Sequence, residues 1–151
     1  MSASWSLLAL IGRAATLAGP ELGGARVVPL RFGLVLLPLV DAVVAAHPDE
    51  AQPPFIECES LTAGVARWAE ALSRRGPLAY VEAEYEAGDG MQAAVMWRDG
   101  RRNYGPERRE RGPINAALRL LGVMRTAAED ETSIVKLARF ASTAGWLAEG
   151  V

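Results

Sequence analysis

The chain has 151 residues, of which half are hydrophobic and 23% are charged, and its formal net charge is −2. This composition is typical of a folded globular protein and excludes a disordered chain. The small net charge provides no overall attraction to nucleic acid or to an anionic membrane. We expect a single domain over residues 1–151, long enough to bury a hydrophobic core.

Cys58 is the only cysteine, so the chain cannot form an internal disulfide, and we expect a reducing, cytoplasmic location. Two apolar segments resemble membrane signals in part. In residues 1–19, no basic residue precedes the apolar patch and Arg13 interrupts it, which argues against a signal peptide. Residues 27–46 contain prolines, a glycine and two charges, which argues against a transmembrane helix.

A first helix is predicted from Ser4 to about Leu17, ended by Gly19 and Pro20. The prediction depends on small and apolar residues at helical spacing. These residues are Leu7, Leu8, Ile11, Ala14, Ala15 and Ala18.

The next segment, residues 26–36, is rich in valine and leucine but contains Pro29 and Gly33. We therefore expect an edge strand there, because proline cannot donate a hydrogen bond inside a sheet. A short helix over residues 39–46 and a surface loop over residues 47–54 are expected to follow.

The clearest helical pattern covers residues 61–75. Ser60 or Thr62 can cap its start, and Gly76 in a left-handed conformation followed by Pro77 would end it. The apolar stripe of this helix consists of Leu61, Val65, Trp68, Ala69 and Leu72.

A three-stranded antiparallel meander is predicted over residues 78–104. Its strands cover residues 78–85, 91–98 and 101–104, and the last two are joined by Asp99-Gly100. That dipeptide is a strong hairpin signal, because a type I′ turn requires positive φ at both central residues.

The C-terminal third is expected to begin with a charged loop over residues 105–112. A helix over residues 114–121, a polar link over 125–132 and a last helix from Ser133 follow. The pattern predicts an α+β fold in which the meander packs against N- and C-terminal helices, with one further edge strand near 26–36.

The alternation of side chains along strands assigns two faces to the meander. The apolar face carries Ala79, Val81, Ala83 and Tyr85 opposite Met91, Ala93, Val95 and Trp97. The other face is polar and is the candidate partner-binding surface. Its candidate residues are Tyr80, Glu82, Glu84, Gln92, Arg98, Arg101 and Asn103. Two alternatives are a solvated sheet face and a Mg²⁺ or Ca²⁺ site formed by Glu82, Glu84, Glu86 and Asp89.

The sequence contains few residues suited to catalysis. His47 is the only histidine and lies in a loop, which excludes a multi-histidine metal site and disfavours a catalytic triad. Cys58 precedes a predicted helix and is either a reactive thiol or a small buried hydrophobe. A hydrolase that pairs Glu82 with Glu84 or Glu57 stays open, because two carboxyl groups can acquire different pKa values from their surroundings.

Six arginines lie between residues 98 and 111, near Trp97 and Tyr104. Arginines interleaved with aromatic residues can bind nucleic acid. Three acids dilute the charge of this segment, so we expect a solvated or partner-facing loop and no nucleic-acid ligand.

Two stretches, GPLAYVEAEYEAGDGMQAAVMW and GPINAALRLLGV, resemble a family of uncharacterised bacterial proteins. That family carries a Y-[VI]-E-A-E-Y-F-G-G-x-G-x-Q-A-A-V-x-W core and a P-I-N-x-A-L-R-x-L-G-V helix. The matching residues are Tyr80, Glu82, Glu84, Tyr85, Gly90, Gln92, Trp97, Pro113, Ile114, Asn115 and Leu118. Positions 86–88 depart from the family pattern. The resemblance covers about the C-terminal half and implies a shared fold, but it assigns no catalytic residue.

The sequence therefore favours recognition of a protein partner, without catalysis and without a cofactor. Small acidic α+β proteins of this kind can be immunity proteins that block a toxin, so by analogy the partner is a toxin or a protein that needs an accessory factor. The alternative functions are the small hydrolase with Glu82 and Glu84 and a self-associating structural protein. The sequence leaves the oligomeric state open.

Overall fold

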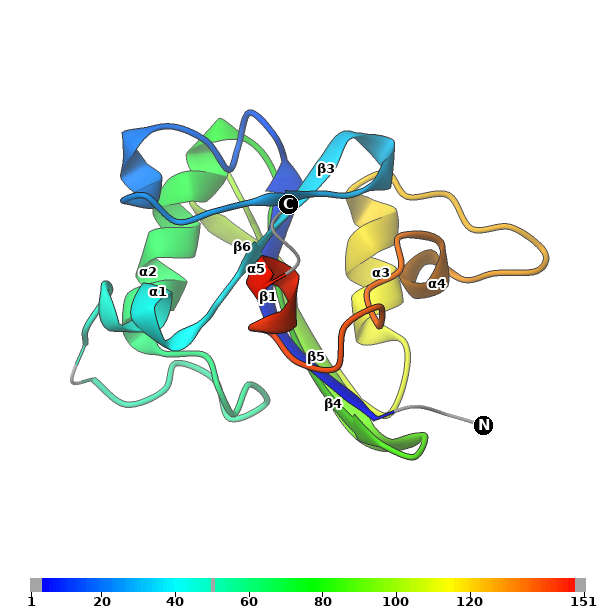
Figure 1. Ribbon diagram of the computed structural model, residues 1–151. Helices are drawn as coiled ribbons and strands as arrows, with labels where there is room; N and C mark the ends of the chain where they lie inside the picture. Colours follow the sequence, from blue (N-terminus) through cyan, green and yellow to red (C-terminus); the bar gives the residue numbers. More distant parts are fainter. Residues whose placement is uncertain (1–3, 50, 149–151) are drawn as a thin grey trace.

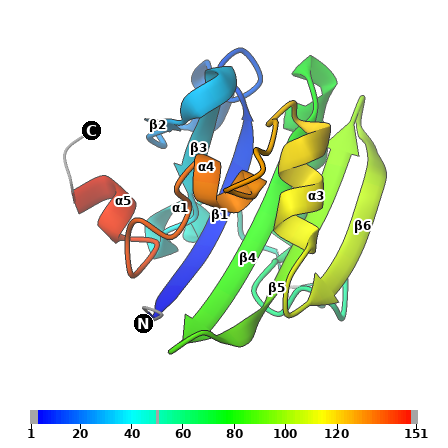
Figure 2. The same cartoon turned by 90° about the vertical axis from the view of Figure 1, so that its right-hand side faces the viewer.

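The computed structural model describes residues 4–49 and 51–148, whose strands form a six-stranded antiparallel sheet (Figures 1 and 2). The order of strands across the sheet is β2-β3-β1-β4-β5-β6. The strands are β1 (Trp5–Arg13), β2 (Val28–Pro29), β3 (Leu34–Pro38), β4 (Leu78–Glu86), β5 (Asp89–Arg98) and β6 (Arg101–Arg109). The helices are α1 (Asp41–Ala45), α2 (Ala63–Leu72), α3 (Pro113–Leu120), α4 (Glu131–Ile134) and α5 (Gly145–Ala148). The α+β prediction is confirmed.

Both faces of the sheet are covered, so the sheet is the middle of three layers. Figure 1 shows α1 and α2 on one side of the strands and α3 and α4 on the other. A separate hydrophobic cluster fills each side: one contains the inner residues of α2, and the other contains those of α3 and α4. The prediction of one solvated sheet face is therefore wrong over most of the sheet.

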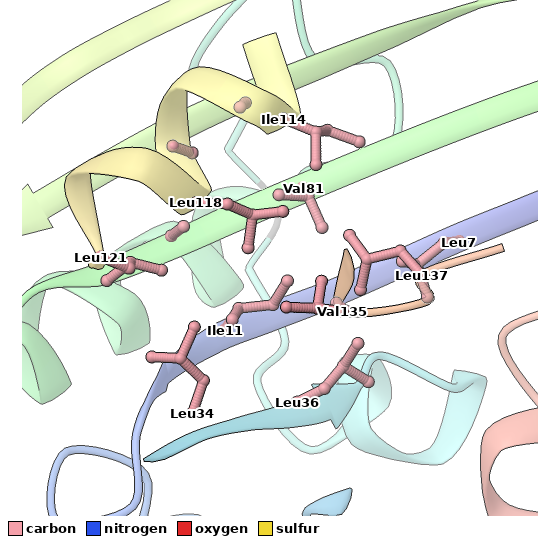
Figure 3. Close-up of a cluster of buried hydrophobic side chains, with 14 of the residues drawn as sticks. Leu7, Ile11, Leu34, Leu36, Val81, Ile114, Leu118, Leu121, Val135 and Leu137 are labelled. Atoms are coloured by element: carbon pink, nitrogen blue, oxygen red, sulfur yellow. The ribbon is translucent and has the colours of Figure 1, made fainter. Parts of the chain in front are cut away.

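Figure 3 shows how the cluster beneath α3 is assembled. Ile114 and Leu118 of α3 point toward Val81 of β4, and Ile11 of β1 and Leu36 of β3 extend the contact across the sheet. All five side chains are fully buried. Burial of such an aliphatic side chain contributes roughly 1.5–3 kcal/mol to folding, so this cluster fixes α3 on the sheet.

The predicted N-terminal helix is wrong, because residues 5–13 form strand β1. This strand lies between β3 and β4, with Ile11 opposite Leu36 on one side and Ala79 on the other. Leu7, Ala9 and Ile11 face one cluster, and Leu10 faces the other. A strand buried on both faces is a continuous apolar run, and such a run also satisfies helical spacing.

The expected strand near residues 26–36 is in fact two strands. β2 is the short edge strand, and β3 lies inside the sheet between β2 and β1. Phe32 and Gly33 form the connection and both have positive φ. None of the helices in the described parts of the chain is long and apolar enough to cross a membrane.

The expected helices on either side of the 47–54 loop both occur. The first is the five-residue α1, and the described part of the loop has no helix or strand; Glu50 lies outside the described residues. α2 begins after Thr62, whose hydroxyl accepts a hydrogen bond of 3.1 Å from the amide of Val65, as predicted for an N-cap. A 3₁₀ turn over Ser73–Arg75 ends the helix, and Gly76 is extended rather than left-handed.

The predicted meander occurs as strands β4, β5 and β6, but it is half of a six-stranded sheet and not a separate three-stranded one. Both residues of the Asp99-Gly100 turn have positive φ, of 53° and 78°. β6 extends to Arg109, so the predicted charged loop is largely a strand. The predicted register is wrong by one residue. A two-residue turn of Ala87 and Gly88 closes the β4–β5 hairpin and places Glu82 opposite Ala93. The predicted faces had instead put Ala93 on the side of the sheet away from Glu82.

The predicted long C-terminal helix is also wrong. α3 forms as expected, but α4 ends near Val135, and Lys136 has a φ of 58°, which interrupts helical geometry. Turns follow as far as α5. They lie along the N-terminal half of β1, where the amide of Ser6 donates to the carbonyl of Ala141 at 3.0 Å.

Candidate functional site

A cleft of about 460 Å³ lies at the end of the sheet where the β4–β5 hairpin turns. Its residues come from β1, β4 and β5, from the segment before α2, from β6 and from the turn before α5. The lining residues are Ser6, Leu7, Leu8, Glu59, Ser60, Glu82, Ala83, Glu84, Glu86, Asp89, Gly90, Met91, Gln92, Arg108 and Thr143.

The cleft is strongly acidic, because five carboxylates and one guanidinium line it. The guanidinium of Arg108 pairs with Glu59 at 3.0 Å. Glu84, Glu86 and Asp89 are exposed, and no ion pair to them is recorded among the described residues. The cleft therefore presents three carboxylates that are free to bind a cationic group.

Glu82 is buried beneath the wall of the cleft, with 8% of its surface exposed. Its carboxylate accepts hydrogen bonds from the amides of Glu59 and Ser60, at 3.0 and 3.1 Å, and from the hydroxyl of Tyr80, at 2.7 Å. A carboxylate that accepts two backbone amides and a hydroxyl is well satisfied without a ligand. Glu82 thus fixes the segment before α2 against β4.

Two neighbouring groups of Glu82 have raised pKa values. Burial, and then the charge of Glu82, raise the pKa of the Tyr80 hydroxyl well above its ordinary value, so it stays a proton donor. Burial raises the pKa of the Cys58 thiol to about 12, and the charges of Glu82 and Glu57 add to this effect. A thiol with this pKa contains very little thiolate at neutral pH, which argues against a nucleophilic role for Cys58.

Glu84 lies in the same row of the sheet as Ser6 and Met91, one on each neighbouring strand. The tight hairpin turn then places Glu86 directly opposite Asp89. Residues on one strand that are two apart face the same side, so Glu82 and Glu84 share a face. One carboxylate of this pair is buried and bonded, and the other is exposed.

Gln92 borders the cleft, but its side-chain amide makes hydrogen bonds that stabilise the fold. Its Oε1 accepts a hydrogen bond of 2.8 Å from the amide of Ile114, and its Nε2 donates to the Tyr85 hydroxyl at 2.9 Å. The amide of Ile114 is one of the groups at the start of α3 that have no partner within the helix. Gln92 is 8% exposed and caps α3.

The seven predicted partner-binding residues do not form one surface. Tyr80, Glu82 and Gln92 are buried, and Glu84 is exposed in the cleft. The remaining three, Arg98, Arg101 and Asn103, are exposed beside the β5–β6 turn. This turn is at the opposite end of the meander, about 20 Å from Glu84 at 3.3 Å per residue along β4.

The arginine-rich segment is mostly the edge strand β6, and several of its side chains have partners within the protein. Arg109 pairs with Glu107 at 2.6 Å, and the guanidinium of Arg102 lies 5.0 Å from the centre of the Phe55 ring. These contacts reduce the free positive charge. His47 lies outside the cleft, stacked on Trp68 with 3.9 Å between ring centres, and burial lowers its pKa.

Within residues 4–49 and 51–148, no group of three or more His, Cys, Asp or Glu residues is arranged to hold a metal ion. The structure therefore does not assemble the metal site considered for Glu82, Glu84, Glu86 and Asp89.

Among the cleft residues that sequence reasoning missed are Ser6, Glu59, Arg108 and Thr143. Thr143 reaches the cleft because its hydroxyl accepts a hydrogen bond of 2.9 Å from the amide of Leu8, 135 positions earlier in the chain. No local pattern signals a contact of that separation. For Glu59 the signal was its position directly before a capped helix that packs on the acidic strand.

Comparisons with family models, curated proteins and solved structures found no match to this chain. The resemblance to a bacterial family stays a prediction.

Proposed function

We propose that the protein recognises a protein partner and that the acidic cleft binds a basic segment of that partner. The observation that carries the proposal is the set of three exposed carboxylates, Glu84, Glu86 and Asp89, gathered around one cleft. Each lacks a recorded ion pair among the described residues. Lysine and arginine side chains are the groups that such a surface attracts.

The fixed geometry of the cleft supports binding rather than chemistry. Glu84 and its neighbours lie on a paired hairpin, and Glu82 holds the opposite wall through two backbone amides. A rigid site loses little conformational freedom on binding. A cytoplasmic protein of immunity or accessory type that holds a toxin or another partner by a basic segment fits this arrangement.

A pull-down from lysate of the source cell tests the proposal. The Glu84→Arg/Glu86→Arg variant should lose a stoichiometric partner that the wild type holds, because both substitutions reverse exposed charges in the cleft. The Glu70→Arg/Glu129→Arg variant is the matched control, since it makes the same change in net charge at exposed positions outside the cleft. Equal loss in both variants, or retention in both, would contradict the proposal.

One observation favours a second candidate function, a small carboxylate hydrolase. A buried carboxyl group, Glu82, and an exposed one, Glu84, face the same cleft, and such pairs can divide the acid and base roles. The hydrogen bonds that already occupy Glu82 argue against it. The test is a screen with chromogenic glycosides and esters, in which Glu84→Gln should reduce any activity by at least about 100-fold.

A further inference from the structure

A second pocket, of about 310 Å³, lies between the end of α3 and the start of α4. It shares no lining residue with the acidic cleft. The helices α3 and α4, whose ends line it, lie on the same side of the sheet (Figure 2). Its lining residues are Arg119, Gly122, Val123, Met124, Arg125 and Glu131. Its volume is at the lower end of the range for small-molecule sites.

Glu131 has one carboxylate oxygen without a partner. The residue is 0% exposed, and its Oε2 accepts a hydrogen bond of 2.8 Å from Nε of Arg119. Its Oε1 is buried and has no hydrogen-bond partner in the described part of the chain. Buried polar atoms almost always have a partner. This carboxylate oxygen is therefore available to accept a hydrogen bond from an N–H or O–H group of a ligand in the pocket.

The same pocket offers groups for a negative charge. The bond to Glu131 uses Nε of Arg119, and no other hydrogen bond or ion pair of this guanidinium is recorded among the described residues. Arg125 lines the pocket and is exposed. Guanidinium groups pair with carboxylates through two parallel hydrogen bonds. The two arginines therefore complement a carboxylate that lies next to the N–H donor.

We propose that this pocket binds a free α-amino acid with an apolar side chain. The α-carboxylate pairs with Arg119 and Arg125, and the α-ammonium donates to Oε1 of Glu131. The side chain of the ligand lies against Val123 and Met124, of which Met124 is 74% exposed. A methionine surface adapts to apolar ligands of different shape. A peptide terminus fits less well, because it carries only one of the two charges.

Binding requires a local rearrangement, since Oε1 of Glu131 is closed to solvent before the ligand arrives. Four of the six lining residues, from Gly122 to Arg125, belong to one segment after α3. Gly122, Met124 and Arg125 of this segment are exposed. Val123 is buried in the cluster on the sheet, so the proposed rearrangement involves the exposed side chains of Met124 and Arg125.

Isothermal titration of the wild-type protein with L-leucine, N-acetyl-leucine and leucinamide tests the proposal. L-leucine should bind at one site per chain with a Kd below about 1 mM. The two analogues each lack one charge and should bind at least about tenfold more weakly. Absence of L-leucine binding at millimolar concentration would overturn the proposal. So would equal binding of the three compounds, because a site for one charge alone would give that result.

Two variants locate the site. Glu131→Gln keeps an oxygen for Arg119 but loses the negative charge for the ammonium, and Arg125→Gln removes a cation from the pocket. Each should weaken L-leucine binding at least about tenfold, whereas Arg98→Gln, at an exposed position outside the pocket, should not. Unchanged affinity in Arg125→Gln would overturn the assignment even if Glu131→Gln did not fold.

Discussion

The hydroxyl of Tyr80 donates a hydrogen bond of 2.7 Å to the carboxylate of Glu82, two residues along the same strand and beneath the cleft. The same carboxylate holds the amides of Glu59 and Ser60. Strand β4 and the segment before α2 are therefore joined through one buried acid. The shape of the cleft depends on that acid, whereas its free charge comes from other residues.

Replacement of Glu82 by alanine should lower the free energy of unfolding by about 3 kcal/mol, because it leaves a buried hydroxyl and two amides without an acceptor. Glu84→Ala, at the exposed position two residues later, should change it by less than about 0.5 kcal/mol. Urea denaturation followed by circular dichroism measures both. Similar effects of the two substitutions would show that Glu82 does not anchor the wall.

Gln92→Ala should destabilise the protein by about 1–3 kcal/mol, because the amide of Ile114 at the start of α3 would lose its acceptor inside the protein. Gln92→Glu should cost less, since a carboxylate still accepts that hydrogen bond and suits the N-terminal end of a helix. Hydrogen exchange at Ile114 provides the local readout. Unchanged protection of this amide in Gln92→Ala would contradict the capping role.

Ala87 has a φ of 52° in the two-residue turn between β4 and β5. Left-handed backbone is unfavourable for alanine, whereas Asn-Gly is a preferred pair for this turn. Ala87→Asn should therefore raise the free energy of unfolding by about 0.5–1 kcal/mol. Ala87→Val should lower it, because a β-branched side chain is strained there. Thermal melting of the two variants in parallel measures the difference.

The raised pKa of Cys58 predicts loss of stability in alkali. The thiol ionises near pH 9 in the unfolded chain but only near 12 in the folded protein. The unfolded state therefore releases this proton first, and the free energy of unfolding falls as the pH rises from 9 toward 12. Cys58→Ala should reduce this slope, and Arg98→Gln should leave it unchanged. A slope that Cys58→Ala does not alter would refute this cause.

If the acidic cleft binds a basic segment, the association rate should fall as salt is added, because mobile ions screen exposed charges with a Debye length of about 8 Å at physiological ionic strength. Stopped-flow mixing with the purified partner measures this rate. The Glu84→Arg/Glu86→Arg variant should be slower and less sensitive to salt. An association rate that does not change with salt concentration would indicate binding by apolar contact and would contradict the prediction.

Local sequence signals predicted the parts of the fold that local interactions determine. The Thr62 cap, the Asp99-Gly100 turn and the meander were all readable, because a side-chain oxygen or a positive φ imposes each one. The acids of β4 were predicted to share one face of a strand because side chains alternate along it. β1 was not, since Leu7 to Ile11 is apolar on every side and fits a buried helix as well as a buried strand.

The rest of the cleft could not be predicted, because its assembly depends on contacts between distant segments. A one-residue error in the register of β4 and β5 exchanged the faces of Gln92 and Ala93 and placed polar groups together that the fold separates. The position of Thr143 depends on strand β1, whose identity the pattern left ambiguous. The sequence showed the acidic residues along β4, but not the other segments that pack beside them and form the cleft.

The turns before α5 have a consequence for how the chain tolerates shortening. β3 pairs with β1 only from Ala9 to Arg13, and beyond that point Ala141 and Thr143 accept the hydrogen bonds of Ser6 and Leu8. A chain cut after Phe140 would leave these amides open along an apolar strand. Exposed strand edges of this kind recruit other molecules, so truncation would add an uncovered apolar edge to the sheet and favour aggregation.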